Sequence, residues 1–358
     1  GVVMTINVTN SIQCAVFFFR RNRAITSETN KWIIPTDSVT TSANGQAIQF
    51  ELKNVNTGLV LDATISSLLS GQSFRLRVDE RNSPKKRFDA EPVVLLPNLK
   101  QSKVVLKEQS ATGFTVEVRD EVNQQTNKLV VSTDPFRIDV YSGDDLVISS
   151  NQRNLFNFEH YRTKPQGLLL DSLCALYRQF AKWYLLIGIS GYLTHAEGTA
   201  EQNTEAVQDS CTESCWEEPF KGSTDSKPNG PMSVGMDFTF VGFDHVYGIP
   251  AHADSFSLRN TKGSSDPYRM YNVDIFEYEL NNPMSLYGAY PLMIAHSTTP
   301  KTVGLFWLNP SETWIDIESS SAGITGLLSN LGLGSSEKPS KLTHWFSETG
   351  LVDVHFLL

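Results

Sequence analysis

Cysteine is scarce in this chain, which has four cysteines among 358 residues. Cys211 and Cys215 have three residues between them and no histidine nearby, a spacing that does not match a zinc site. They could form a local disulfide or stay as free thiols in a loop, and their spacing fits both alternatives. We therefore expect neither a metal ion nor any other cofactor.

Basic clusters are also lacking. The net charge is −9, and the densest basic run is the three residues 85–87. Proteins that bind nucleic acid usually gather lysine and arginine on one face, so this charge distribution argues against a nucleic-acid partner. It is compatible with a neutral substrate such as a glycan.

The chain has no long uninterrupted hydrophobic run. Residues 168–193 come closest, but Asp171, Arg178 and Lys182 interrupt them, which makes them a poor membrane span. We predict an amphipathic helix there. An acidic, polar and mobile loop is expected to follow at 196–215. No membrane span is expected.

The first residues lack the basic, apolar and cleavage-site order of a secretory signal peptide. Asn7, Val8 and Thr9 nevertheless form an N-glycosylation sequon, which matters only in a secretory compartment. Such triplets are common by chance. Asn7 is therefore a candidate glycosylation site.

Apolar and polar residues alternate in several short runs in the first half of the chain. This period of two predicts strands of a sheet with one face in water. Pro135 is expected at the start of a strand, where no hydrogen bond of the sheet is lost. A tight turn is expected at 142–145, as in a hairpin. The alternating runs are 47–52, 59–64, 74–78, 114–118 and 134–140.

Residues 230–314 carry the clearest functional signal. Turn-forming residues separate apolar and aromatic runs about every eight to twelve positions, which is typical of an antiparallel sheet protein. Polar and aromatic residues such as Asp244, Asp254 and Tyr271 gather between the runs. A sugar offers hydroxyl groups at its edges and C–H groups on its faces, so loops of this composition suit a carbohydrate site. A rigid sandwich of sheets is a good base for such loops.

Nine short strings in the second half of the chain stand in a fixed order. They lie at 225–228, 230–235, 245–250, 271–274, 282–284, 286–288, 306–309, 312–314 and 347–350. In this order they resemble the N-terminal domain of glycoside hydrolase family 31. Within the family they are most similar to the alpha subunits of the endoplasmic-reticulum glucosidases that trim N-linked glycans.

The resemblance implies an all-β fold, an antiparallel β-supersandwich of the galactose-mutarotase-like type with one inserted helix and a mobile loop. It divides the chain into an N-terminal segment at 1–31, a first part of the sandwich at 32–166, a helical and disordered insertion at 167–224, and a second part of the sandwich at 225–358. In the family the sandwich leads into a catalytic (β/α)8 barrel. That barrel is absent from this sequence, whose last strand stops in mid-pattern, so we expect a truncated protein.

The resemblance also suggests site residues. Asn272 and Asp274 match an Asn-x-Asp loop that contacts substrate hydroxyl groups in the family. Without the resemblance, Asp274 would more readily be interpreted as the cap of a turn. His245, Tyr247 and His252 match a loop at the interface with the barrel, and ordinary hydrogen-bonded loop histidines are the alternative. Their spacing does not match a metal site.

Two positions depart from the family pattern. Ala251 stands where the family carries a glutamate before the second histidine, and Cys14 stands alone where the family usually has two cysteines. These departures concern the interface with the barrel and an N-terminal disulfide, respectively.

The resemblance implies a retaining alpha-glucosidase, which needs two carboxylates about 5 Å apart. In the family the barrel supplies both, one of them in a Trp-x-Asp-Met-Asn-Glu motif that this chain lacks. We therefore predict a non-catalytic N-terminal domain that is inactive alone. The complete protein would trim glucose from N-linked glycans in the endoplasmic reticulum lumen, with its own barrel and a beta subunit as partners. The alternatives are a stand-alone carbohydrate-binding or interaction module and a mutarotase-type enzyme, for which no pair of histidine and acid stands out.

Overall fold

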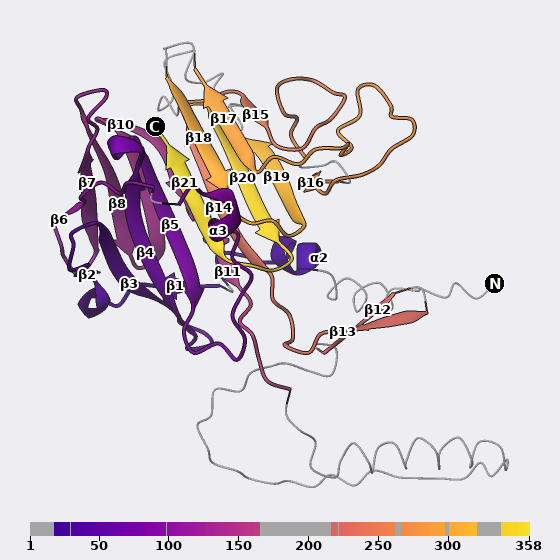
Figure 1. Cartoon of the computed structure of the whole chain (residues 1–358), viewed down its shortest axis with the longest axis horizontal. Helices are drawn as coiled ribbons and strands as arrows, with labels where there is room; N and C mark the ends of the chain where they lie inside the picture. The colour runs from indigo at the N-terminus through magenta and orange to yellow at the C-terminus, as the bar shows by residue number, and fades with distance from the viewer. Residues whose placement is uncertain are drawn as a thin grey trace, which may run out of the picture.

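Strands dominate the part of the chain that the computed structural model describes (Figure 1). Asn7, the four cysteines, the predicted helix at 168–193 and the predicted loop after it lie outside the described residues, so these predictions stay predictions. The described residues are 18–28, 30–97, 99–164, 216–220, 222–261, 266–297, 301–320 and 338–358.

The first sheet contains nine strands of the described residues, and each strand pairs antiparallel with its neighbours. Across the sheet the order is β1 (Trp32–Ile33), β3 (Ala47–Asn54), β4 (Val60–Leu68), β5 (Ser73–Glu80), β21 (Val352–Leu357), β18 (Thr302–Trp307), β17 (Leu292–His296) and β15 (Val246–Gly248), with β2 (Thr40–Thr41) paired to β3. β21 lies inside the sheet, between β5 and β18 (yellow in Figure 1). This strand therefore joins the two halves of the sequence.

The second sheet contains ten strands of the described residues and is also antiparallel. Its order is β16 (Tyr268–Met270), β19 (Thr313–Ser319), β20 (Ser340–Ser347), β14 (Val234–Val241), β10 (Asp145–Ser150), β9 (Phe136–Ser142), β8 (Thr126–Thr133), β7 (Gly113–Arg119) and β6 (Val105–Lys107), with β11 (Asn157–Phe158) paired to β14. Here β14 joins the halves, because it pairs with β10 on one side and β20 on the other.

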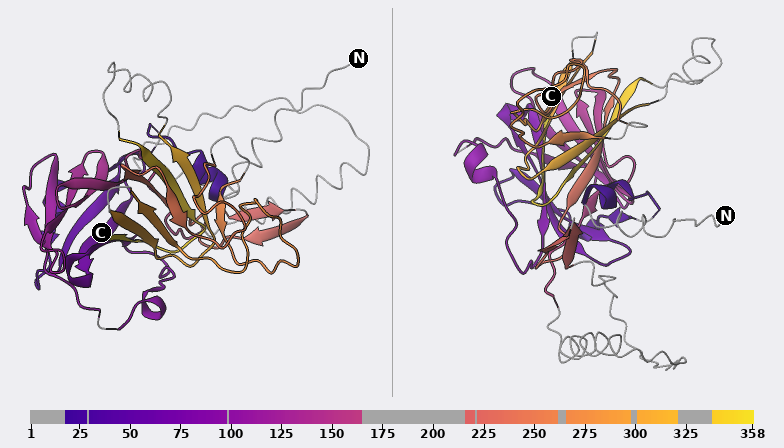
Figure 2. Two further views of the ribbon diagram at one scale, coloured as in Figure 1. Left: turned by 90° about the horizontal axis from the view of Figure 1, so that it is seen from above. Right: turned by 90° about the vertical axis from the view of Figure 1, so that its right-hand side faces the viewer.

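A two-stranded ribbon of β12 (Glu217–Phe220) and β13 (Ser223–Ser226) lies outside both large sheets in each view (Figures 1 and 2). The helical elements in the described ranges are short: α2 (Phe18–Arg23), α3 (Glu91–Val94) and the 3-10 turns η1 (Thr36–Ser38) and η2 (Leu69–Gly71). None of them has the length and apolar character that crossing a bilayer requires. With two antiparallel sheets and little helix, the described part of the chain is an all-β sandwich and contains no (β/α)8 barrel.

The hydrophobic core lies between the inner faces of the two large sheets. Phe238 of β14 lies edge-on to Trp307 of β18, with ring centroids 6.1 Å apart, and to Phe356 of β21, at 6.2 Å. Aromatic pairs of this geometry add about 0.5–1.5 kcal/mol beyond the burial of their area. Trp307 is fully buried, and its Nε1 donates a hydrogen bond to Ser347 Oγ at 2.9 Å. Trp307 is therefore a residue of the core.

The alternating runs of the sequence fall on β3, β4, β5 and β7, and the turn at 142–145 joins β9 to β10. The prediction for Pro135 is wrong by one residue. Asp134 and Pro135 form the two-residue turn between β8 and β9, and the strand begins at Phe136. Proline has no N–H group to donate. The last residue pair of the two strands is therefore Thr133 with Phe136, on either side of the turn.

α2 packs on the second sheet, where it contacts β20. Phe19 stacks on Trp314 with ring centroids 4.5 Å apart, so Trp314 is an interface aromatic between helix and sheet. Arg23 donates two hydrogen bonds to the Asp316 carboxylate, at 2.8 Å and 2.6 Å. Burial alone would raise the pKa of Asp316, but the hydrogen bonds and the charge of Arg23 outweigh it and hold the pKa below its ordinary value.

A buried histidine makes the stability of this sheet depend on pH. His344 of β20 lies opposite Asp237 of β14 and Asp316 of β19. Burial, with repulsion from Arg153, lowers the pKa of the His344 imidazole to about 3. Below about pH 6.5 the unfolded chain binds a proton there that the folded chain does not. The free energy of unfolding should therefore fall as the pH drops from about 6.5 toward 3, by up to about 1.4 kcal/mol per pH unit.

Urea denaturation at pH 7 and pH 5 measures this effect. His344→Gln should remove part of the dependence on pH, and buried His355, whose pKa burial also lowers, should keep the rest. The same change at exposed His296 is the matched control and should leave the dependence of the unfolding free energy on pH unchanged. If the unfolding free energy of His344→Gln depends on pH as strongly as that of the unchanged chain, the role given to His344 is wrong.

Candidate functional site

The loop at 271–291, between β16 and β17, contains the two residues predicted to contact substrate (Figure 1). Backbone hydrogen bonds tie it to itself and to the segment before it. Val273 N donates to Leu286 O at 2.8 Å, Leu286 N to Ala251 O at 2.9 Å, and Ala251 N to Gly288 O at 2.7 Å. Ala251 therefore helps to order this loop through its backbone N–H and C=O groups. Its small side chain does not interfere with these hydrogen bonds.

Asn272 and Asp274 are both exposed. Within the described part of the chain, neither side chain forms a hydrogen bond or an ion pair. The side chain that caps a turn in this loop is that of Asn282, whose Oδ1 accepts a hydrogen bond from Met284 N at 3.0 Å. Asn272 and Asp274 therefore present polar groups that remain available to a ligand. Their contact with substrate stays a prediction.

The same loop also carries exposed aromatic residues. Phe276 is 99% exposed, Tyr278 52%, Tyr287 61% and Tyr290 63%. Several large exposed apolar side chains on one loop are a feature of interaction sites. The loop thus combines polar groups that have no partner among the described residues with exposed aromatic rings, and both are available for contact with a ligand or another protein surface.

The three residues expected at a loop or interface, His245, Tyr247 and His252, make contacts with residues near them in the sequence. His245 Nδ1 lies 2.8 Å from Ser257 Oγ, and His252 Nδ1 lies 2.6 Å from the Pro250 carbonyl oxygen. The Tyr247 ring stacks on the ring of Phe256 at 4.8 Å. No cluster of metal-ligating side chains occurs among the described residues. These contacts fit loop residues that order the chain around the edge strand β15.

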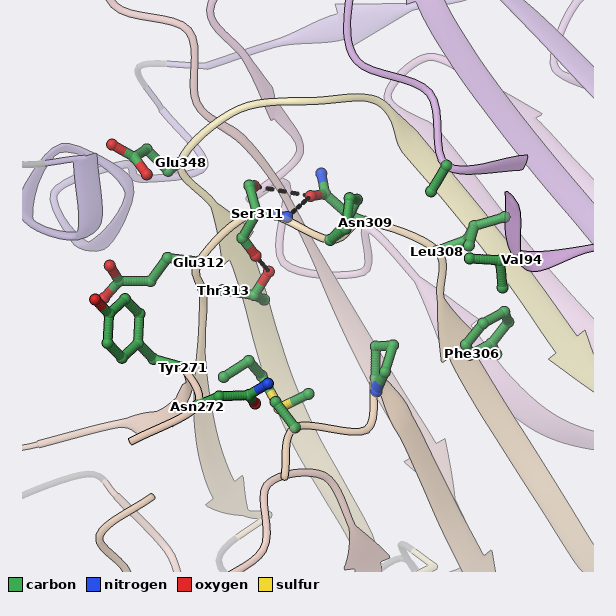
Figure 3. A pocket seen from close by; sticks show the side chains of 15 residues that line it. Val94, Tyr271, Asn272, Phe306, Leu308, Asn309, Ser311, Glu312, Thr313 and Glu348 are labelled. Atoms are coloured by element: carbon green, nitrogen blue, oxygen red, sulfur yellow. Dashed lines mark hydrogen bonds between the residues drawn. The ribbon is translucent and has the colours of Figure 1, made fainter. Parts of the chain in front are cut away.

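A cavity of about 610 Å³ lies beside this loop (Figure 3). Asn272 lines it, whereas Asp274, His245, Tyr247 and His252 do not. Its apolar wall comes from α3, β18 and the residue after β18, and its polar end from the loops that precede β17, β19 and β21. Val94, Phe306 and Leu308 form one side, and Tyr271, Asn272, Glu312 and Glu348 lie on the other.

Hydrogen bonds hold the polar end of the cavity in shape. Asn309 Nδ2 donates to Thr349 O at 2.7 Å and to Leu351 O at 3.1 Å. Asn309 Oδ1 accepts from Ser311 N at 3.0 Å and from Ser311 Oγ at 2.8 Å (Figure 3). Glu312 Oε1 accepts from Trp314 Nε1 at 2.6 Å. These side chains fix the backbone at the bottom of the cavity.

Arg269 of β16 contacts two residues that line this end of the cavity, although it does not line the cavity itself. Its Nε lies 2.5 Å from Glu312 Oε1, and its guanidinium lies 4.3 Å from the centroid of the Tyr271 ring. The cation is therefore already engaged by a carboxylate and by an aromatic face. Sequence reasoning missed the cavity, because its lining residues come from segments that are far apart in the sequence.

Two ion pairs hold the wall formed by α3. Arg75 lies 2.7 Å from Glu91, and Arg77 lies 3.0 Å from Asp89. The hydrogen bond from Arg75 lowers the pKa of Glu91 against the opposing effect of burial. This short helix is thus fixed to the outer face of β5, and the wall of the cavity is preformed.

Comparison with known proteins places the chain in a family. Residues 63–316 match the model of the glycosyl hydrolase 31 N-terminal galactose mutarotase-like domain. The chain is 34% identical over 364 residues to neutral alpha-glucosidase AB of Mus musculus, which covers 100% of the chain and 36% of the mouse protein. The chain thus spans about a third of the length of this relative.

Solved structures agree with this match. The structure of an endoplasmic-reticulum glucosidase II complex, consisting of the catalytic subunit and the binding domain of the regulatory subunit, has a TM-score of 0.71 and 31% identity, over 96% of this chain and 35% of that one. A glucosidase II alpha subunit bound to Glc1Man2 has a TM-score of 0.71 and 30% identity over the same shares. The chain therefore belongs to glycoside hydrolase family 31, in which it corresponds to the N-terminal galactose-mutarotase-like domain.

Proposed function

We propose that this chain is the non-catalytic, substrate-facing domain of an alpha-glucosidase that trims glucose from N-linked glycans in the endoplasmic reticulum lumen. The loop at 271–291 carries the proposal, because it exposes Asn272 and Asp274 without partners in the described part of the chain. The names of the relatives support the substrate class, since they are neutral alpha-glucosidases and glucosidase II alpha subunits.

The proposed division of labour follows from the chemistry of a retaining glycosidase. Two carboxylates of the barrel attack the anomeric carbon and protonate the leaving oxygen. Asp274 contributes no proton or bond. Its carboxylate accepts hydrogen bonds from neighbouring sugar hydroxyls, which are strong because the acceptor is charged. Asn272 adds an amide that both donates and accepts. Contacts of this kind accelerate hydrolysis when they tighten as the sugar ring distorts toward the transition state.

Two partners follow from the same proposal. The exposed aromatic rings of the loop at 271–291 would pack on the catalytic barrel of the complete protein. A beta subunit is proposed because one related alpha subunit was solved with the binding domain of its regulatory subunit. A mutarotase-type reaction is not proposed, since His245 and His252 are engaged with Ser257 and Pro250.

Hydrolysis by the isolated chain tests the non-catalytic part of the proposal. The purified 358-residue chain should release no p-nitrophenol from p-nitrophenyl α-D-glucopyranoside, because the two barrel carboxylates are missing. A family enzyme with its barrel is the positive control. Release that increases in proportion to the concentration of the chain, and survives repurification, would overturn the assignment.

A further inference from the structure

The cavity beside the loop at 271–291 has two unlike sides (Figure 3). Val94, Phe306 and Leu308 offer an apolar face, while Asn272 and Glu312 lie at the polar side. Its volume of about 610 Å³ falls within the range of small-molecule sites, which are mainly apolar with a few fixed polar groups.

The charges around the cavity restrict the class of ligand. Glu312 and Glu348 are acidic, Glu312 is paired with Arg269, and none of the residues that line the cavity is basic. An anionic ligand would therefore find no basic side chain in the cavity to pair with. A purely apolar ligand would bury the Asn272 amide without a hydrogen bond, which costs about 1–3 kcal/mol.

A neutral sugar ring satisfies both sides of the cavity. Its C–H face can lie on Phe306 and Leu308, and its hydroxyl groups can reach the Asn272 amide and the carboxylates at the opposite end. The walls need no rearrangement, because ion pairs hold α3 and hydrogen bonds hold the loop around Asn309. Preformed walls reduce the entropy cost of binding.

We propose that this cavity is a second carbohydrate site, which holds one neutral hexopyranose unit of a glycan. It shares Asn272 with the substrate contact proposed above, but it does not include Asp274, which does not line the cavity. The chain would then bind one sugar of a glycan in this cavity, whether or not Asp274 contacts the glucose that is removed.

Adjacent valines of α3 give a matched pair of variants. Val94 lines the cavity and is 50% exposed, whereas Val93 is 86% exposed and does not line it. An arginine at 94 would lie across the cavity and pair with its carboxylates, so Val94→Arg should raise the Kd for a sugar at least about tenfold, or about 1.4 kcal/mol. Val93→Arg adds the same charge outside the cavity and should leave the Kd unchanged.

Titration of the methyl-labelled 358-residue chain with methyl α-D-glucopyranoside, followed by NMR, provides the test. The methyl signals of Val94 and Leu308 should shift and saturate, and those of Val93 should not. Methyl glucuronide, which has the same ring with a carboxylate, should bind at least about tenfold more weakly because of the acidic end.

Several outcomes would overturn the second site. These are the absence of saturable shifts, an unchanged Kd in Val94→Arg, or equal binding of the glucuronide. Asp274→Ala should retain the shifts at Val94, and their loss would place the sugar on the loop at 271–291 instead. Failure of this site would be distinguishable from failure of the proposed function, because the site is measured by sugar binding and the proposed function by hydrolysis.

Discussion

Replacing Asp274 with alanine in the complete enzyme should lower kcat/KM for an alpha-glucoside about 100-fold, while the protein stays folded. Hydrogen bonds to a charged group contribute about 1.5–3 kcal/mol, and 100-fold corresponds to about 2.7 kcal/mol. The side chain is exposed and has no partner in the described part of the chain, so its removal leaves no buried group unpaired. The loss should therefore appear in the kinetics and not in the melting temperature.

Glu277 provides the control for this prediction. It is another exposed carboxylate of the same loop, three residues further along. Glu277→Ala removes the same charge. If the position of the carboxylate matters and the net charge does not, its effect on kcat/KM should be about ten times smaller than that of Asp274→Ala. Steady-state kinetics on both variants, with thermal melting of each, decide the matter. Kinetics of Asp274→Ala that match those of the unchanged enzyme would end the assignment.

Replacing Arg87 with methionine should destabilise the sandwich by about 3–5 kcal/mol, the usual cost of removing one partner of a buried ion pair. The Arg87 side chain has no exposed surface, and Glu80, its partner at 2.5 Å, is 3% exposed. The guanidinium also lies between two aromatic rings, 4.4 Å from the centroid of Phe158 and 4.5 Å from that of Tyr161.

The same guanidinium connects distant parts of the chain. Its Nη1 donates to the carbonyl oxygens of Met232 and Gly350, each at 2.9 Å, and its Nη2 donates to that of Glu159. Methionine fills similar space but leaves these buried carbonyls and the Glu80 carboxylate without their donor. The loss of stability in Arg87→Met should therefore come more from unpaired polar groups than from lost side-chain volume.

Urea denaturation measures this prediction against Lys86→Met, the neighbouring exposed position, which should stay within about 0.5 kcal/mol of the unchanged chain. A double-mutant cycle with Glu80→Gln isolates the ion pair. If Arg87→Met and Lys86→Met unfold at the same urea concentration, the central role given to Arg87 is wrong.

The local elements of this fold could be predicted from the sequence because their signal is local. The alternation of apolar and polar residues located β3 and β5, and Trp307 could be placed in the core from its apolar strand. The pairing of β5 with β21 has no such signal. It joins Arg75 to Asp353, which are 278 positions apart, and only the folded chain brings those charges together.

The candidate site divides in the same way. Asn272 and Asp274 could be proposed from a short string and its resemblance to a family, and the exposure of both was then visible in the structure. The cavity could not be proposed, because Val94, Phe306 and Glu348 come from segments far apart in the sequence. No residue type or spacing in any one of those segments indicates a hollow between them.

The position of β21 also has a consequence for protein synthesis. A ribosome that has translated the chain as far as β20 has already released β5 and β18, but not the strand that separates them in the finished sheet. Until residues 352–357 emerge, β5 and β18 each present an unpaired edge of N–H and C=O groups, which other chains can bind. Pairings between positions so distant in sequence also form slowly. The nascent sandwich is therefore most exposed to aggregation just before its last strand arrives, which is when a chaperone would be of most use.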